Sequence, residues 1–197
     1  MENNNNVQIE NRIFLGARYN TIIGFTCNVD EATTGEVLSV QYEESNQKEM
    51  NRIQREGALK VLIQLMEQID TEAIYAPTQV FMVQDLYKVI ANQTYKYWIM
   101  SGEYSDGTAL DEQELELWDK FADLMDSVGR YFVFKDIYNA NFEGKAKYNT
   151  EDVEYNKFYY DWLIGELERL APAPKNPRQS ARSRRNRNLR TPNEQVG

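Results

Sequence analysis

Residues 12–42 read RIFLGARYNTIIGFTCNVDEATTGEVLSVQY. This stretch contains three runs rich in β-branched and aromatic residues, namely RIFLGAR, TIIGFTCNV and EVLSVQY. Turn-forming residues separate the runs at Tyr19-Asn20 and around Thr34-Gly35. Short apolar runs joined by tight turns are typical of neighbouring antiparallel strands. The stretch therefore predicts three antiparallel strands at the start of a sheet.

A long helix and a buried strand are predicted after this stretch. Asn46 and Glu49 have the spacing of a helix N-cap and its partner three residues later. Over 50–69 the apolar residues recur at helical spacing, which indicates a helix with a buried face. The compact apolar run VFMV (80–83) then favours a strand that is buried on both faces.

The second half of the chain predicts four elements and one loop. In chain order they are a helix from Asp85 to about Met100, a loop over 102–108, a helix with its apolar face over 117–128, a strand over 131–137 and a helix from Thr150 to Leu170. The predicted order of elements over the whole chain is βββ-α-β-α-α-β-α.

The end of the chain differs in charge from the rest. Residues 171–197 contain seven of the 22 basic residues and only one acid, Glu194. The chain carries a net charge of −9, so the +6 of this segment leaves −15 on residues 1–170. A segment so poor in apolar residues cannot bury enough surface to fold alone, and we expect a disordered, Arg-rich tail. The predicted nucleic-acid contacts are its basic residues, Lys175, Arg178, Arg182, Arg184, Arg185, Arg187 and Arg190.

The dominance of arginine favours nucleic acid, and RNA before DNA, as the partner of the tail. A guanidinium group both binds phosphate and stacks on bases, whereas lysine would serve a tail needed only for solubility. Three other roles stay open for the tail. It could fold back on the acidic body, keep the protein soluble, or bind an acidic partner protein.

Composition limits the remaining possibilities. The length and the 42% hydrophobic content suit one domain, at 7–170, after a polar segment at 1–6. Cys27 is the single cysteine and no apolar run has transmembrane length, which predicts a soluble cytoplasmic protein without an internal disulfide and without a membrane partner. The absence of histidine excludes His-based metal sites, Ser-His-Asp triads and imidazole acid–base chemistry.

Four short motifs lie in order on the predicted elements. They are NQKEMNRIQREGALKVL (46–62), VQDLYKVI (83–90), ELWDKF (116–121) and YYDWL (159–163). In these motifs and in its order of elements, the chain resembles the ribonuclease H family over about residues 7–170. The resemblance implies an α/β fold, with a mixed five-stranded sheet of the α+β kind that is flanked by helices and begins with three antiparallel strands.

The resemblance also implies where a catalytic site would lie. Nucleases of this family hold two divalent metals with carboxylates from separate elements, so that one metal activates a water and the other stabilises the leaving oxygen. The matching positions in this chain are Glu56, Asp85 and Asp161. Glu49 is the alternative for the first position, and Tyr160 is the alternative for the last.

The first strand departs from the family pattern. Where these enzymes have an Asp followed by Gly, this chain has Leu15-Gly16, and only a shifted alignment would use Glu10 instead. The basic segment, glycine-rich loop and histidine of the family are also missing, since 98–118 and 138–156 are acidic. The carboxylate set is therefore incomplete. This predicts a domain without cofactor, in which Glu56, Asp85 and Asp161 would bind Mg²⁺ only if the protein were active.

Each of the three acids also has a structural interpretation. Asp85 has the position of the N-cap of the helix that it begins. Glu56 borders an apolar helix face, where a charged residue is usually solvated. Asp161 is one of many acids in the last helix and suits its surface.

The aromatic residues of the last helix allow two interpretations. Those within 155–160 have the chemistry of a base-stacking platform. The interpretation that we favour puts Phe158, Trp162 and Leu163 on the core side of the helix and the tyrosines at its edge. All three tryptophans of the chain are expected in the core.

The sequence as a whole favours a nucleic-acid-binding protein, with RNA preferred, in which the tail supplies phosphate affinity and a degenerate ribonuclease H-like domain does not cleave. One alternative is an active metal-dependent ribonuclease that cleaves RNA in RNA–DNA hybrids. Another is an assembly protein that uses the fold as a docking module.

Overall fold

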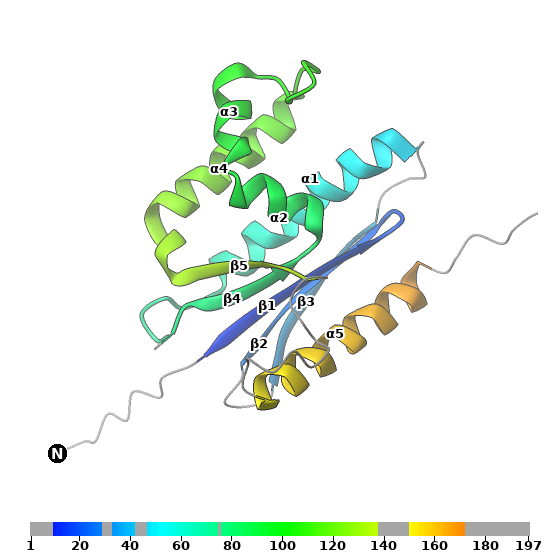
Figure 1. Ribbon diagram of the computed structural model, residues 1–197, viewed down its shortest axis with the longest axis vertical. Helices are drawn as coiled ribbons and strands as arrows, with labels where there is room; N and C mark the ends of the chain where they lie inside the picture. Colours follow the sequence, from blue (N-terminus) through cyan, green and yellow to red (C-terminus); the bar gives the residue numbers. More distant parts are fainter. Residues whose placement is uncertain (1–9, 29–32, 42–46, 75, 138–149, 172–197) are drawn as a thin grey trace, which may run out of the picture.

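The computed structural model describes residues 10–28, 33–41, 47–74, 76–137 and 150–171. They form a sheet with helices on both faces (Figure 1). The polar segment at 1–6 and the predicted tail from residue 172 onward lie outside the described residues. None of the described helices has the length and apolar character of a membrane-spanning segment.

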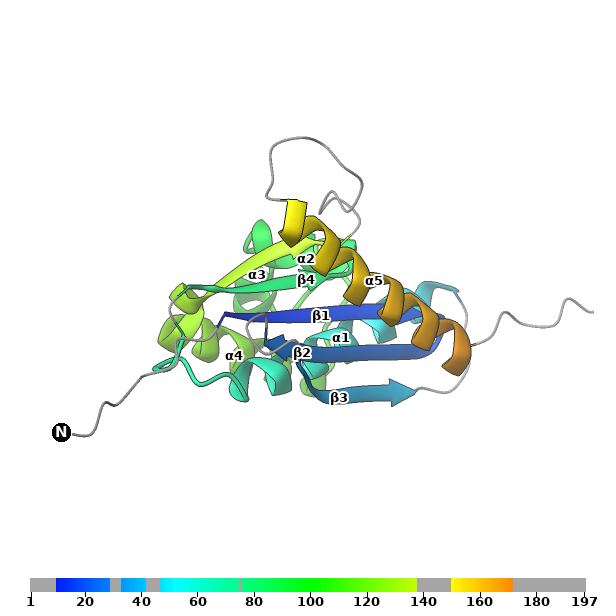
Figure 2. The ribbon, with the colours of Figure 1, turned by 90° about the horizontal axis from the view of Figure 1, so that it is seen from below.

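The sheet contains five strands in the order β3-β2-β1-β4-β5. The strands are β1 (Asn11–Arg18), β2 (Thr21–Asn28), β3 (Thr33–Gln41), β4 (Thr78–Met82) and β5 (Phe132–Asp136). The first three pair antiparallel, β4 runs parallel to β1, and β5 runs parallel to β4. Figure 2 shows β1 between β2 and β4. The predicted antiparallel start and the mixed sheet are confirmed.

Within the described residues, five α-helices and one short 3-10 helix connect and follow the strands. They are α1 (Gln47–Glu67), α2 (Gln84–Ala91), α3 (Thr94–Ser101), α4 (Glu112–Val128), the 3-10 helix η1 (Gly129–Tyr131) and α5 (Thr150–Leu170). The long first helix and the last helix were both predicted. Between β4 and β5 the structure has one α-helix more than the sequence pattern indicated.

The predicted helix from Asp85 to Met100 is wrong, because the chain forms two helices there. The break lies at Asn92 and Gln93, and Gln93 has a left-handed backbone with φ of 54°. A residue in this conformation cannot continue a right-handed helix. The proposed N-cap role of Asp85 is also wrong, since the N-cap is Val83. Asp85 is exposed in the first turn of α2, where its charge complements the helix dipole.

Successive side chains of a strand point to opposite faces of the sheet, and here they build two cores. Ile13 and Leu15 contribute to the core that also includes side chains of α1, α2, α3 and α4. Phe14 contributes to the core under α5, on the other face (Figure 1). Gly24 allows α1 to approach β2 closely, because a Cβ there would lie 2.5 Å from Cγ1 of Val61.

The core side of α5 differs from the prediction. Tyr159, Leu163 and Leu167 are buried against the sheet, and the ring of Tyr159 stacks on Phe14 at 5.9 Å. Phe158, which we expected in the core, is 64% exposed. Adjacent residues of an α-helix are about 100° apart around its axis, so only one of Phe158 and Tyr159 can face the sheet.

The tryptophans lie largely where they were expected. Trp98 and Trp118 are buried, and their rings meet edge to face at 5.6 Å. Together with Tyr95, which stacks on Trp118 at 5.7 Å, they join α3 to α4. Trp162 is half-buried and packs edge-on against Phe25 at 4.8 Å.

Candidate functional site

The first strand carries an apolar side chain where the resemblance implies a metal ligand. Leu15 is fully buried on the face of the sheet that α1 covers. Its Cδ1 lies beside Gly24, as does Cγ1 of Val61. On the other face a Cβ on Gly16 would lie 2.8 Å from Cδ1 of Leu167. The second half of β1 is therefore enclosed by apolar side chains on both faces.

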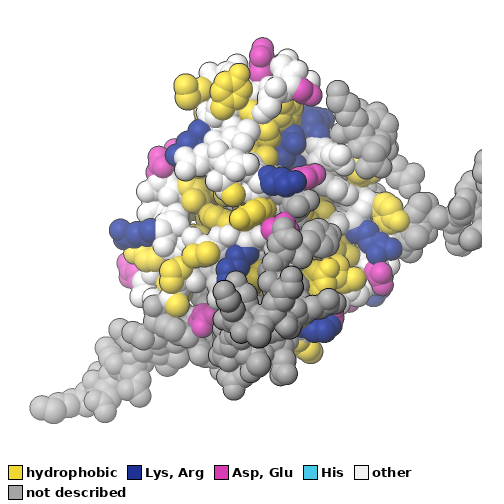
Figure 3. All heavy atoms as spheres, viewed as in Figure 1, with side chains coloured by type: hydrophobic (Ala, Val, Ile, Leu, Met, Phe, Trp, Pro, Cys, Tyr) yellow, Lys and Arg dark blue, Asp and Glu magenta, His cyan; other side chains and the backbone are white. Residues whose placement is uncertain are grey.

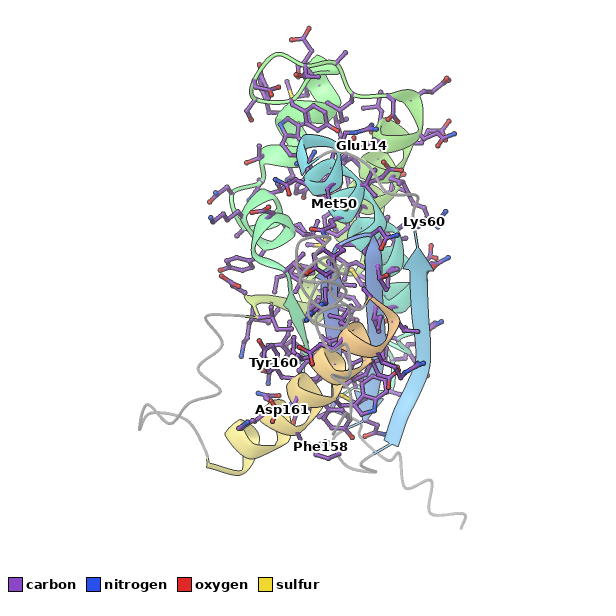
Figure 4. The ribbon with its side chains drawn as sticks, turned by 90° about the vertical axis from the view of Figure 1, so that its right-hand side faces the viewer. Met50, Lys60, Glu114, Phe158, Tyr160 and Asp161 are labelled. Carbon is purple, nitrogen blue, oxygen red and sulfur yellow. The ribbon has the colours of Figure 1, made fainter. Side chains whose placement is uncertain are left out.

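Two of the three predicted ligands are exposed and belong to separate helices. Asp85 follows β4, in the first turn of α2. Asp161 lies on α5, where its Oδ2 is 2.6 Å from Nζ of Lys157. Figure 4 shows Asp161 and Tyr160 on α5. Glu114, which belongs to α4, lies away from them, at the other end of the view. Both aspartates thus have the surroundings of ordinary surface charges.

Glu10, the alternative ligand for the first strand, takes part in a different contact. Glu10 precedes β1 and pairs with the buried Arg12, with Oε1 3.0 Å from Nη2. Arg12 also donates a hydrogen bond from Nη1 to Oδ1 of Asn156 on α5, at 2.5 Å. Glu10 therefore takes part in a contact between β1 and the last helix. The side chain of Glu49 lies outside the described part of the structure.

Glu56 is the one predicted ligand that joins a group of carboxylates. One oxygen of Glu56 lies within 4.8 Å of oxygens of Asp111 and Glu114. Among the residues that the structure describes, this is the only such group of three or more acidic, His or Cys side chains, and it includes neither Asp85 nor Asp161. The structure therefore does not bring the three predicted ligands together.

Asp111 and Glu114 come from the start of α4, which the sequence analysis did not single out. Asp111 is the N-cap, and its Oδ1 accepts a hydrogen bond from the backbone N–H of Glu114 at 2.8 Å. An Asp followed three residues later by Glu before an apolar run is a signal for a helix start. That signal predicts the cap, but the packing of this helix start against Glu56 requires the tertiary structure.

Two arginines of α1 meet these carboxylates. Nη1 of Arg52 lies 2.5 Å from Oδ2 of Asp111, and Nη2 of Arg55 lies 3.5 Å from Oε1 of Glu114. The hydroxyl of Tyr104 donates a hydrogen bond to Oε2 of Glu114. Because the side chain of Glu114 is completely buried, these donors replace the water that its carboxylate has lost.

The guanidinium group of Arg55 also lies against two aromatic rings. It is 4.9 Å from the ring centre of Trp98 and 4.8 Å from that of Tyr104. The two rings meet edge to face at 5.1 Å, and Nε1 of Trp98 donates a hydrogen bond to Oγ of Ser105 at 3.2 Å. Cation–π contacts of this kind add to the ion pair with Glu114. Arg55 thereby fastens the segment between α3 and α4 to α1.

Burial and charge alter the protonation of the three carboxyl groups in different ways. The pKa of Glu56 is raised by burial first, and then by the charges of Asp111 and Glu114. Burial also raises the pKa of Glu114, although Arg55 acts in the opposite direction. The pKa of Asp111 is lowered, chiefly by the hydrogen bond from the backbone N–H of Glu114. Burial therefore disfavours the charged form of Glu56 and Glu114, and only Glu56 is further affected by the charges of both neighbouring carboxylates.

These residues can be interpreted as a metal site or as a structural contact. Carboxylate oxygens are the ligands that Mg²⁺ and Ca²⁺ prefer. Here, however, Asp111 and Glu114 already accept bonds from Arg52, Arg55 and Tyr104. An ion would have to displace both guanidinium groups. We therefore interpret Glu56, Asp111 and Glu114 with their two arginines as a structural contact, called below the α1–α4 junction.

The predicted nucleic-acid contacts in the tail lie outside the described residues. They are Lys175, Arg178, Arg182, Arg184, Arg185, Arg187 and Arg190. Their contribution stays a prediction from charge and composition.

Comparison with known proteins places the fold in context. No protein-family model and no curated protein matches this chain. Among solved structures, the foamy viral protease-reverse transcriptase in complex with dsDNA is similar with a TM-score of 0.41 and 10% identity, over 77% of this chain and 90% of that chain. The PFV RNase H domain in solution is similar with a TM-score of 0.42 and 12% identity, over 76% of this chain and 92% of that chain.

At these low identities and TM-scores the assignment of the fold depends on topology. The sheet begins with three antiparallel strands, continues with two parallel ones, and is covered by helices on both faces. This is the arrangement that the resemblance implied. The domain has a ribonuclease H-like fold.

Proposed function

We propose that this protein binds nucleic acid, with RNA preferred, and that its ribonuclease H-like domain does not cleave. In this proposal the Arg-rich tail supplies most of the phosphate affinity. The folded domain contributes a rigid body beside the bound strand. Mg²⁺ is not required for either role.

The observation that carries the non-catalytic part of the proposal is the burial of Leu15. A two-metal mechanism needs oxygen ligands that converge from separate elements. Leu15 offers none, and the exposed Asp85 and Asp161 form no group with Glu56 among the described residues. Glu56 instead belongs to the α1–α4 junction, where arginines already neutralise the neighbouring carboxylates.

The charge distribution supports the binding part of the proposal. Residues 1–170 carry a net −15, which repels phosphate, whereas the tail carries +6. Binding should therefore depend on the tail and weaken with salt. If all seven basic residues met phosphates of a single strand, the slope of log K against log salt concentration would be at most about −5.

The first experiment measures cleavage of an RNA–DNA hybrid with Mg²⁺ or Mn²⁺. We expect no cleavage above background by the full chain. An Asp85→Asn variant is the control for contaminating nuclease, because cleavage that persists in it does not come from this site. Cleavage by the parent protein that disappears in Asp85→Asn would overturn the proposal in favour of an active ribonuclease.

The second experiment measures binding to single-stranded RNA over a range of salt concentrations. A variant in which all seven basic residues of the tail are replaced by Gln should lose most of the affinity and most of the salt dependence. A matched variant with the six arginines replaced by Lys keeps the charge. It should retain the slope and lose part of the affinity, because lysine does not stack on bases. Unchanged binding by the Gln variant would show that the tail is not the binding element.

A further inference from the structure

A pocket of about 340 Å³ opens between α2, α3, α4 and β5, away from the α1–α4 junction. This volume lies at the lower end of the range for small-molecule sites and suits a ligand with one ring system. None of the implied catalytic positions Glu56, Asp85 and Asp161 lines it. Its chemistry is therefore separate from that of the implied catalytic site.

The wall of the pocket is apolar and partly aromatic. Tyr87, Met125 and Phe134 line it, and all three are half-buried, so that they are held in place but remain accessible. The ring of Phe134 packs against Phe121 of the core at 6.3 Å. Flat rings and a methionine thioether form a surface on which a planar aromatic ligand stacks well.

The rim of the pocket is polar and carries both signs of charge. Gln93, Lys96 and Asp126 line it, and all three are exposed. The amide of Gln93 both donates and accepts hydrogen bonds, the carboxylate of Asp126 accepts, and the ammonium group of Lys96 attracts anions. Nucleobases present donors and acceptors along one edge, and the attached phosphate supplies an anion. This combination fits a nucleotide better than it fits a purely apolar ligand.

The backbone of Gln93 is a second observation at the same place. Its φ of 54° lies in the left-handed region, which is unfavourable for a residue other than glycine. Glycine would adopt this conformation without strain, yet this chain has a long polar side chain there. The left-handed turn separates α2 from α3, and Gln93 lines the pocket at this turn.

The outer face of α3 extends the same surface. Gln93, Lys96, Tyr97 and Met100 are three or four residues apart, so they lie on one side of the helix. Tyr97 is 57% exposed and Met100 is 86% exposed. Figure 3 shows apolar side chains at the top of the view, where α3 lies in Figure 1. A strand with one base in the pocket would find a second apolar surface along this helix.

We infer that the pocket between α2, α3, α4 and β5 binds one unpaired nucleobase, with its phosphate near Lys96. This inference rests on the proposed function, which it deepens by giving the folded domain a base-recognition site. The base can come from a single strand or from a free nucleotide. The two sources share the same chemistry and are separated by the experiment.

The test uses the full chain and two probes. One is a single-stranded RNA of about ten nucleotides with the fluorescent base 2-aminopurine at a central position, and the other is AMP. Binding of the RNA is measured at about 0.1 M salt, where the tail should contribute, and again at about 0.5 M salt, where the charges of the tail act over a shorter range. The fluorescence reports whether the base leaves its stack with neighbouring bases.

The informative variants are Tyr87→Ala, Lys96→Ala and Gln93→Gly, with Lys88→Ala as the control. Tyr87→Ala should weaken binding about tenfold, because stacking of one base on an aromatic ring contributes that much or more. Lys88 is exposed on α2 outside the pocket, so its removal changes the net charge as Lys96→Ala does. Lys88→Ala should weaken binding less than about twofold.

Gln93→Gly keeps the test valid if another variant fails to fold. It removes the rim amide and at the same time relieves the left-handed strain, so the protein should be at least as stable as the parent. Loss of the fluorescence change in this variant cannot then be attributed to unfolding. A parental fluorescence change and affinity in Gln93→Gly would argue against the inference.

The outcomes separate the inference from the proposed function. If the parent binds RNA and all three pocket variants match Lys88→Ala, the inference is wrong and the proposed function stands. If AMP binds in a pocket-dependent way and RNA binds at neither salt concentration, the inference holds and the proposed function fails. If neither probe binds to the parent protein at either salt concentration, both are wrong.

Discussion

The acidic residues of the α1–α4 junction and those at the implied catalytic positions have opposite surroundings. In the junction, Glu56, Asp111 and Glu114 lie within reach of one another and meet two arginines. At the implied positions, Asp85 and Asp161 are exposed on different helices. Acidic residues on helices thus form a partly buried network in one region and remain solvated charges in the other.

The difference shows that convergence of carboxylates depends on helix packing rather than on their order in the chain. The start of α4 packs against α1, and this contact gathers the junction. At the centre of the sheet, Leu15 and its apolar neighbours occupy the place that an ion would need. Substitutions in both regions test this comparison.

Leu15→Asp should destabilise the protein most, by more than about 4 kcal/mol, because it buries a charge among apolar side chains. Leu15→Ala, which removes the same packing without adding charge, should cost about 3 kcal/mol. Urea unfolding followed by fluorescence measures both. Recovery of stability in Leu15→Asp on addition of Mg²⁺ would contradict our interpretation that apolar side chains fill this part of the sheet, because it would reveal an ion site there.

Glu114→Ala should cost about 3 kcal/mol, because it leaves the guanidinium group of Arg55 partly buried without its ion pair. Glu116→Ala is the matched control on the same helix, and its exposed side chain should change the stability by less than about 0.5 kcal/mol. Equal effects of the two substitutions in chemical denaturation would show that the junction does not stabilise the fold.

Glu56→Gln tests the excess negative charge of the junction through pH. The folded protein raises the pKa of Glu56 above its ordinary value of 4.5, so it binds a proton more readily than the unfolded chain does. Its contribution to stability is therefore greatest below pH 4.5 and is lost as the pH rises towards the raised pKa. At pH 7 we expect Glu56→Gln to be more stable than the parent protein by less than about 1 kcal/mol, because solvent screens this half-buried group.

The pH profile provides the control for Glu56→Gln. The advantage of the variant should shrink when denaturation is repeated at pH 4, because the parental Glu56 is then largely protonated in both states. An advantage that is equal at pH 4 and pH 7 would mean that charge at Glu56 is not the cause.

Asp161→Asn should have the smallest effect, a loss of about 0.3–0.5 kcal/mol, because its partner Lys157 lies one turn away on an exposed helix face. A double-mutant cycle with Lys157→Gln isolates the pair, and the coupling should fall further in high salt. A loss of more than about 2 kcal/mol would place Asp161 in a buried network and contradict the comparison.

Much of the secondary structure follows from local patterns. The runs in 12–42 are rich in β-branched and aromatic residues as strands are, and the apolar spacing over 50–69 indicates α1. The break between α2 and α3 was missed, because Gln93 adopts a left-handed conformation that local patterns assign to Gly or Asn. We predicted Phe158 on the core side of α5 and the tyrosines at its edge, but Tyr159 is buried and Phe158 is exposed. The sequence did not decide this, because two different rotations of α5 would each turn aromatic residues towards the sheet.

The candidate sites were only partly accessible to sequence reasoning. Glu56 was identified, but as a ligand beside Asp85 and Asp161 rather than as a neighbour of Asp111 and Glu114. The pocket near Gln93 has no sequence signature, since α2, α3, α4 and β5 each contribute to it. Residues that are distant in sequence become a site only through packing.

The sequence alone was enough to predict the strands and the long first and last helices, the lack of an acidic ligand at Leu15, and the contrast between an acidic body and a basic tail. These properties depend on local periodicity, residue type and net charge, which do not require knowledge of contacts. Only the tertiary structure decided which acids meet, which arginines neutralise them, and where a pocket opens. Such properties arise when helices pack on a sheet, because the rotation of each helix decides which charged groups become neighbours. Burial then changes the free energy of their charged forms.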